Sequence, residues 1–171
     1  KDRDAVKALI AQVVSEEGAT LLGWRDVPTD SSTVGESAVA VKPVFEQICS
    51  ELGLDPDSVK VSKKPWYGWG GAMGPAQFIP STWVQYKERI GDMTGNSPPN
   101  PWDSRTAIFA TAILLMDNGA DKQTRASERL AALRYLAGWA NAHKSAYAFY
   151  GDDVMGLADK FQKEIDVLEG R

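Results

Sequence analysis

The stretch of sequence that decides the fold reads Gly70-Gly71-Ala72-Met73-Gly74-Pro75-Ala76-Gln77-Phe78-Ile79-Pro80-Ser81-Thr82-Trp83. Its first part is rich in glycine, and glycines let a backbone turn tightly and approach another group closely. Its second part passes through Pro80, and proline is favoured in the first turn of a helix. The stretch therefore predicts a tight glycine turn followed by a helix that begins near Pro80 or Ser81 and runs to Ile90.

Helical periodicity continues on both sides of this stretch. Apolar residues recur at steps of three and four, as on one face of a helix, over residues 2–17, 42–52, 105–118, 127–139 and 152–168. Asp103 or Ser104 can cap the helix over 105–118, and Gly119 ends it. No alternating pattern typical of a strand pair is present. The predicted fold class is mainly α, with a single multi-helix domain over residues 1–171 in which 18–41 form an atypical loop region.

Composition and charge narrow the function classes. The chain has 171 residues and a formal net charge of −4, so it lacks the strong basic field with which proteins neutralise nucleic-acid phosphates. No apolar run approaches the ~20 residues of a membrane span, and residues 1–4 do not read as a signal peptide. Ligand spacing typical of a metal site is absent. We expect no nucleic-acid partner, no metal and no organic cofactor.

The single cysteine, Cys49, excludes a disulfide within the chain and a cysteine-based metal cluster. It lies on an apolar helical stripe, and the only histidine, His143, gives no local sign of a catalytic dyad. A buried and inert thiol is therefore the preferred interpretation of Cys49, ahead of a nucleophile.

The glycine turn has features that suit a sugar ligand. Gln77 supplies donors and an acceptor for hydroxyl and N-acetyl groups. The flanking aromatic rings, which suit stacking on sugars, are Trp66, Tyr67, Trp69, Trp83 and Tyr86. A tight interhelical turn lined by core aromatics would look similar, so both interpretations remain open from the residues alone.

Several motifs resemble those of the lytic murein transglycosylases, especially the membrane-bound B type. They are Gly71-Ala72-Met73-Gly74 with Gln77-Phe78, then Pro80-Ser81-Thr82-Trp83, Asn100-Pro101-Trp102-Asp103 and Arg134-Tyr135. The resemblance covers about residues 45–171 and implies a lysozyme-like multi-helix fold. It also implies peptidoglycan glycan strands as the partner, a cell-envelope or extracellular location, and a monomer.

The resemblance implies cleavage of the bond between N-acetylmuramic acid and N-acetylglucosamine, with one glutamate as general acid and base. Most glycosidases use two carboxylates, but here the muramic 6-hydroxyl takes the place of water. Glu16 and Glu17 occupy the family's catalytic position. At ~100° per residue, Glu17 falls in the middle of the helix's apolar face and Glu16 at its margin. We therefore assign catalysis to Glu17 ahead of Glu16; two exposed residues at a helix end is the alternative.

The substrate-binding residues implied by the resemblance are Gly71, Met73, Gln77, Tyr135, Tyr147 and Tyr150. Tyr135 is equally well explained as a core tyrosine, and Trp24 and Trp102 are assigned to packing. The sequence departs from the family at two positions: Gly18 replaces the Ser or Thr after the catalytic glutamate, and Leu136 replaces the Asn that follows the family's Tyr.

A second resemblance covers about residues 16–47. Glu16-Glu17-Gly18-Ala19-Thr20-Leu21-Leu22-Gly23-Trp24-Arg25-Asp26-Val27-Pro28-Thr29-Asp30, with Gly35-Glu36 and Lys42-Pro43-Val44, is similar to part of the amidotransferase domain of glutamate synthase. The nucleophile of that domain is an N-terminal cysteine, whereas this sequence starts at Lys1. Two families meet near Glu16, so the chain is a natural fusion, an engineered hybrid or an artificial sequence.

Three functions compete. The first is an active lytic transglycosylase or lysozyme-like glycosidase. The second is a catalytically inactive peptidoglycan-binding module of the same fold, and the third is an amidotransferase fragment. We expect the first.

Overall fold

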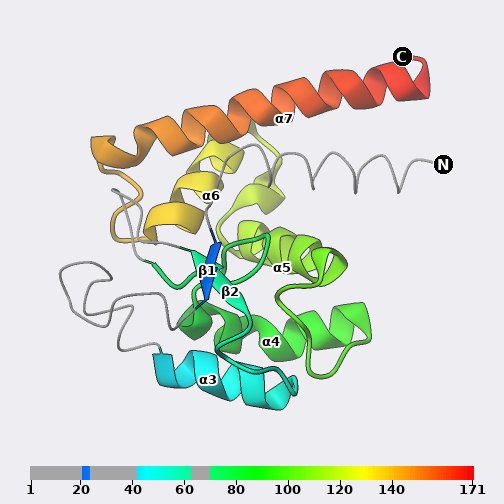
Figure 1. Cartoon of the computed structure of the whole chain (residues 1–171). Helices are drawn as coiled ribbons and strands as arrows, with labels where there is room; N and C mark the ends of the chain where they lie inside the picture. Colours follow the sequence, from blue (N-terminus) through cyan, green and yellow to red (C-terminus); the bar gives the residue numbers. More distant parts are fainter. Residues whose placement is uncertain (1–20, 24–41, 63–69) are drawn as a thin grey trace. The chain divides into compact units, whose positions relative to one another are not determined.

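The computed structural model of the chain describes residues 21–23, 42–62 and 70–171 (Figure 1). The elements, in chain order, are β1 (Leu21–Gly23), α3 (Lys42–Glu51), β2 (Lys60–Ser62), α4 (Pro80–Thr94), α5 (Ser104–Asp117), the 3₁₀ turn η2 (Ala120–Lys122), α6 (Arg125–Ala137), the 3₁₀ turn η3 (Ser145–Tyr147) and α7 (Ala148–Glu169). Helix dominates the described residues, which confirms the mainly α fold class. Helix content alone does not test the finer prediction of a lysozyme-like arrangement.

The chain divides into two compact units, Lys1–Thr111 and Ala112–Arg171, and each is described by itself. A single domain over residues 1–171 stays a prediction. Among the described residues, no helix is both long and apolar enough to cross a membrane.

The helix limits follow local capping chemistry. Asp103 caps α5 as predicted, because its Oδ2 accepts hydrogen bonds from the Thr106 backbone N at 2.7 Å and from Thr106 Oγ1 at 2.8 Å. These hydrogen bonds, the backbone one first, hold the pKa of Asp103 below its ordinary value. The helix α6 begins earlier than predicted, since Thr124 and Ser127 form a capping box. The helix predicted over residues 2–17 lies outside the described residues.

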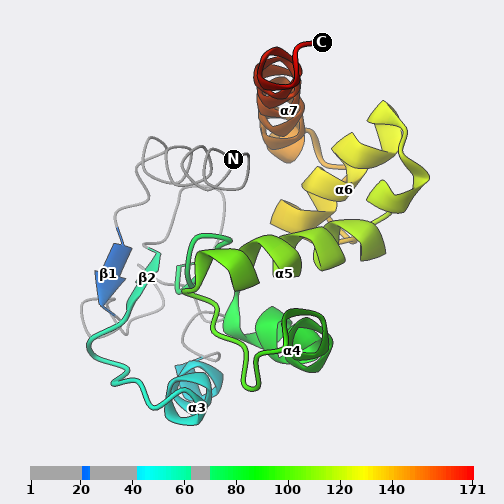
Figure 2. The ribbon, with the colours of Figure 1, turned by 90° about the vertical axis from the view of Figure 1, so that its right-hand side faces the viewer.

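A short antiparallel strand pair, visible in Figure 2, was not predicted. β1 pairs with β2 in the register Leu21↔Ser62, Leu22↔Val61 and Gly23↔Lys60. The prediction that no strand pair exists was wrong, and the reason is length: three residues give too few positions for a two-residue period to be recognised. Part of the predicted loop region 18–41 is therefore a strand.

In the first unit, α3 and α4 lie against each other around an apolar core. The fully or nearly fully buried side chains include Phe45, Ile48, Cys49, Val61, Met73, Phe78, Trp83 and Ile90. At the edge of this core, Lys87 Nζ donates to both carboxylate oxygens of Glu51 at 2.8 and 2.9 Å. That hydrogen bond is the main reason the pKa of Glu51 lies below its ordinary value. The ion pair fixes the end of α3 on α4, while the apolar core supplies most of the stability.

Trp102 joins three segments of the first unit, which confirms its assignment to packing. Its indole Nε1 donates to the Lys60 carbonyl of β2 at 3.0 Å. Its ring meets the Phe45 ring of α3 edge-on, with centroids 6.3 Å apart. Its backbone N donates to Asn100 Oδ1 at 2.8 Å, which closes the turn before α5.

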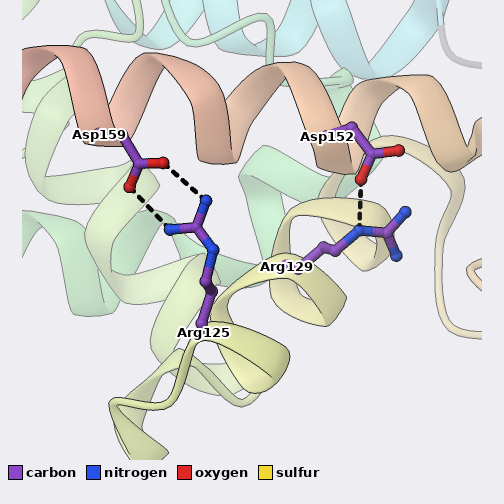
Figure 3. Close-up of polar contacts among 4 residues, drawn as sticks. All are labelled: Arg125, Arg129, Asp152 and Asp159. Carbon is purple, nitrogen blue, oxygen red and sulfur yellow. Dashed lines mark hydrogen bonds and ion pairs between the residues drawn. The ribbon is translucent and has the colours of Figure 1, made fainter.

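In the second unit, two ion pairs join α6 to α7 (Figure 3). Arg125 donates to both oxygens of Asp159 at 2.7 Å, and Arg129 Nε donates to Asp152 at 2.7 Å. Each hydrogen bond lowers the pKa of its carboxyl group and raises that of its guanidinium. Because the residue early in α6 pairs with the later one in α7, the two helices run antiparallel.

Apolar contact between the same helices lies behind the ion pairs. A Cβ at the buried Gly151 would lie 3.0 Å from two side-chain carbons of Leu133, so a glycine here lets α7 approach α6 closely. Met155 is also buried. The ion pairs are exposed to solvent and screened by salt, so they set the register of the helices more than they stabilise the unit.

Among the glycines for which contacts are described in the first unit, Gly74 has the closest one: its φ is +63° and an added Cβ would lie 1.9 Å from the carbonyl oxygen of Pro101. We expect Gly74→Ala to lower the free energy of unfolding by about 2–5 kcal/mol, from left-handed strain and overpacking together. Gly95→Ala is the matched control, because Gly95 has φ +75° but open space around it; its loss is about 1–2 kcal/mol. Urea unfolding measures both, and equal losses would show that the contact with Pro101 is unimportant.

Candidate functional site

The glycine turn is the feature that the sequence marked most strongly, and the structure shows it as a closed loop beside β2. Met73 and Phe78 pair as an isolated bridge, with Met73 N to Phe78 O at 2.9 Å and Phe78 N to Met73 O at 3.1 Å. Met73 also bridges to Val61 of β2. Gly71 N donates to Ser62 O at 2.9 Å, and Ala72 N donates to Ser62 Oγ at 3.1 Å. The backbone of the turn, from Gly71 to Met73, therefore pairs with β2.

Gln77 lies at the tip of this loop in a left-handed conformation with φ +55°. Its side-chain Nε2 donates to the Gly74 carbonyl at 2.8 Å, and its backbone N donates to the same oxygen at 3.1 Å. The side chain closes the turn while remaining half-buried. Its predicted role in substrate binding stays a prediction.

The other predicted binding residues fall in two groups. Gly71 and Met73 lie in the same turn as Gln77, and the Met73 side chain is fully buried in the core. Tyr135, on α6, and Tyr147 and Tyr150, at η3 and the start of α7, are half-buried and belong to the second unit. The structure brings Gly71, Met73 and Gln77 together in one turn. No observation tests the binding roles of these residues, which stay predictions.

The predicted acids Glu16 and Glu17 lie outside the described residues, as do the predicted flanking aromatics Trp66, Tyr67 and Trp69. The structure therefore carries no geometry for the proposed acid. Among the described residues, no group of three or more His, Cys, Asp or Glu side chains is arranged to hold a metal ion.

Cys49 is fully buried on the inner face of α3. Burial, and then the negative charges of Asp55 and Glu46, raise the pKa of its thiol to about 11. The thiolate is the nucleophilic form of cysteine, so this environment disfavours both reaction and access. The structure agrees with a buried and inert thiol.

A polar cluster that sequence reasoning missed lies at the end of α5, in the second unit. Arg134 Nη1 donates to the Asn118 carbonyl at 2.6 Å, and the Trp139 indole Nε1 donates to Asn118 Oδ1 at 2.9 Å. The Arg134 guanidinium carbon lies 3.6 Å from the centroid of the Trp139 ring. Asn118 is 4% exposed, and its Nδ2 has no hydrogen-bond partner. The sequence feature that could have indicated this cluster is the Asn118-Gly119 pair at the end of one predicted helix, with Arg134 in the next.

Comparison with known proteins points to the N-terminal part of the chain. The family model of the class-II glutamine amidotransferases matches residues 1–66. The chloroplastic ferredoxin-dependent glutamate synthase 2 of Arabidopsis thaliana is 41% identical over 53 residues, which cover 31% of this chain and 3% of that protein. The chloroplastic ferredoxin-dependent glutamate synthase of Oryza sativa subsp. japonica is 31% identical over 61 residues, which cover 36% of this chain and 4% of that protein. No solved structure matches.

These findings correct the main functional prediction. The matched range contains Glu16 and Glu17, so the residues assigned to transglycosylase acid catalysis belong to a stretch with amidotransferase similarity. The assignment as a lytic murein transglycosylase, the cleavage of peptidoglycan and the partner role of glycan strands were wrong. Both relatives are named as chloroplastic, which gives no support to a cell-envelope location.

The burial of Cys49 generates a prediction about its reactivity. Raising the pKa from 9.0 to about 11 lowers the thiolate fraction at pH 8 about 100-fold. We expect Ellman's reagent to modify the native chain at least about 100-fold more slowly than the chain in urea. Because the chain has one cysteine, the signal reports this thiol alone. Rapid modification of the folded chain at pH 8 would contradict the burial.

The raised pKa of Cys49 also makes the stability of the fold depend on pH. The stabilising contribution of the protonated thiol is fully present below pH 9 and is lost as the pH rises through about 11.

The turn-closing hydrogen bond of Gln77 generates another prediction. Gln77→Ala removes the bond to Gly74 O but keeps a side chain at φ +55°, so we expect a loss of about 0.5–1.5 kcal/mol in the free energy of unfolding. Gln77→Gly removes the same bond and also the left-handed strain, so we expect it to be about 1 kcal/mol more stable than Gln77→Ala. Urea unfolding of the parent and both variants measures the two effects. If Gln77→Ala matches the parent, the bond does not hold the turn.

Proposed function

We propose that the chain belongs to an amidotransferase-type enzyme that takes the amide nitrogen of glutamine, and that residues 1–66 form part of its class-II glutamine amidotransferase domain. The observation that carries the proposal is the match of the family model over these residues. The two glutamate synthases agree with it, with identities of 41% and 31% over 53 and 61 residues. The chain spans only 3–4% of the length of these relatives, so the activity of the whole enzyme is part of the proposal.

The described part of the matched range is compatible with a packed fragment of such a domain. β1 pairs with β2 across the range, from Leu21↔Ser62 to Gly23↔Lys60. The helix between them, α3, buries Phe45, Ile48 and Cys49 completely or almost completely. The paired strands and the buried side chains of α3 indicate that the range contributes to a core.

The chemistry of amide-nitrogen transfer restricts what this part does. Attack of a thiolate on the side-chain amide of glutamine releases ammonia and leaves a thioester, which water hydrolyses to glutamate. The sequence resemblance implies an N-terminal cysteine as the nucleophile. Cys49 does not fit that role, because it is fully buried and its pKa is raised to about 11. The proposal therefore gives α3 a structural role in the domain and assigns the nucleophile elsewhere.

The lysozyme-like arrangement of the remaining helices stays a proposal about fold alone. It is supported by the helical content of α4, α5, α6 and α7, and it carries no claim about glycan chemistry.

The test is glutamate release from L-glutamine by the natural full-length protein. We expect glutamate and ammonia in equal amounts, and we expect Cys49→Ser to keep the activity within about twofold, since a buried thiol of raised pKa is not the attacking group. A glutamine-directed alkylating analogue, followed by peptide mapping, locates the residue that does attack.

Two outcomes would count against the proposal. A folded full-length protein that releases no glutamate from glutamine would exclude the amidotransferase activity. Labelling of Cys49 by the analogue, with loss of activity in a folded Cys49→Ser variant, would make Cys49 the nucleophile and overturn its structural role.

A further inference from the structure

The cluster around Asn118 contains the reactants of a well-defined self-modification. Asn118 is followed by Gly119, and this is the only Asn-Gly pair in the sequence. A glycine after asparagine leaves its backbone nitrogen unhindered by a Cβ, so that nitrogen can reach the side-chain carbonyl carbon of the asparagine when the backbone is free to move.

The reaction balances without an external reagent other than water. The Gly119 nitrogen gives up its proton and forms a bond to Asn118 Cγ, and the bond from Cγ to Nδ2 breaks. Nδ2 leaves with the proton as ammonia, and a five-membered succinimide remains. Water then opens the ring to aspartate or isoaspartate.

In the folded chain, hydrogen bonds hold the attacking nitrogen of Gly119 and both carbonyl oxygens of Asn118, but not the leaving nitrogen. Gly119 N donates to Met116 O at 2.9 Å, which ties up the attacking nitrogen. Trp139 Nε1 holds Asn118 Oδ1 at 2.9 Å, and Arg134 Nη1 holds the Asn118 backbone carbonyl at 2.6 Å. Only Nδ2, which leaves in the reaction, lacks a hydrogen-bond partner.

We propose that Asn118–Gly119 is a site of succinimide formation and deamidation that the native fold restrains and that opens when Trp139 and Arg134 release Asn118. Of the hydrogen bonds that hold Asn118, we expect the one from the Trp139 indole to break most easily. Trp139 is 63% exposed and lies on the segment that follows α6. Asn118 itself is 4% exposed, so local opening at the end of α5 must precede reaction.

The position of Gly119 makes the restraint specific to this fold. Its φ of +107° requires glycine, and an added Cβ would lie 3.3 Å from Arg134 Nη1. The backbone at position 119 therefore requires glycine, and glycine is also the residue that makes Asn118 prone to succinimide formation. The hydrogen bonds to Asn118 slow that reaction in the folded chain. An isoaspartate at position 118 would lengthen the backbone by one atom and displace the carbonyl that Arg134 binds.

The experiment is peptide mapping by mass spectrometry after incubation at mildly alkaline pH. It compares the parent in buffer, the parent in urea, Trp139→Phe and Trp139→Ala. Trp139→Phe keeps an aromatic ring for Arg134 but removes the indole N–H. We expect the parent in buffer to react slowest and the chain in urea fastest. Loss of the indole hydrogen bond should raise the rate about two- to tenfold, since one hydrogen bond changes the local opening equilibrium by about this factor.

The control is Val167→Ala, which truncates a side chain that is 77% exposed at the far end of α7; it should react at the parent rate. Circular dichroism shows whether each variant stays folded, and Trp139→Phe provides the milder change if Trp139→Ala unfolds. The proposal is overturned if Asn118 deamidates as fast in buffer as in urea, if it does not deamidate in urea, or if folded Trp139→Phe and the parent react at the same rate.

Discussion

The close approach of Gly74 to the Pro101 carbonyl is the constraint on which the first unit depends. Position 74 has no room for a Cβ and requires a positive φ, so the turn reverses there in one way only. The reversal pairs Met73 with Phe78 and with Val61, which attaches the turn to β2. The same segment that receives Gly74 continues into Trp102, whose indole binds Lys60 O of β2 and whose ring packs on Phe45. One residue without a side chain therefore allows β2, α3 and the start of α5 to meet.

In the second unit, three arginine side chains hold neighbouring segments together. Arg134 stacks on Trp139 and binds the carbonyl of Asn118, directly after α5, where the partial negative charge of a helix end favours a cation. The Arg125–Asp159 and Arg129–Asp152 pairs align α6 with α7 from the solvent side. Of the three arginines, only Arg134 binds a group that is buried, so its contact depends least on ionic strength. The cluster at Asn118 thus connects the end of α5 with α6 and the segment after it. In our proposal it also slows succinimide formation at Asn118–Gly119.

The glycine turn explains why the functional prediction failed. A ligand cradle and a tight structural turn both need glycines, a polar side chain and neighbouring aromatics, so the residue types alone do not separate them. In the structure, Gln77 Nε2 satisfies Gly74 O, and Phe78 meets Trp83 edge-on at 5.4 Å inside the core. Among the described residues that suggested sugar binding, Gln77 hydrogen-bonds within the turn and Trp83 is buried in the core. The second resemblance, to the amidotransferase domain of glutamate synthase over about residues 16–47, is the one that agrees with the family match over residues 1–66.

By itself the sequence determined the approximate positions of α3, α4, α5, α6 and α7, the cap of α5 and the inert character of Cys49. These properties depend on spacing and on local chemistry: apolar residues at steps of three and four, Asp103 before α5, Gly119 after it, and a cysteine on an apolar stripe. Only the tertiary structure decided the β1–β2 pair, the direction of the Gln77 side chain and the Asn118–Arg134–Trp139 cluster. Each of these joins residues that are distant in sequence or turns on a backbone conformation set by packing. Local periodicity carries no information about which carbonyl a side chain will reach once the chain has closed.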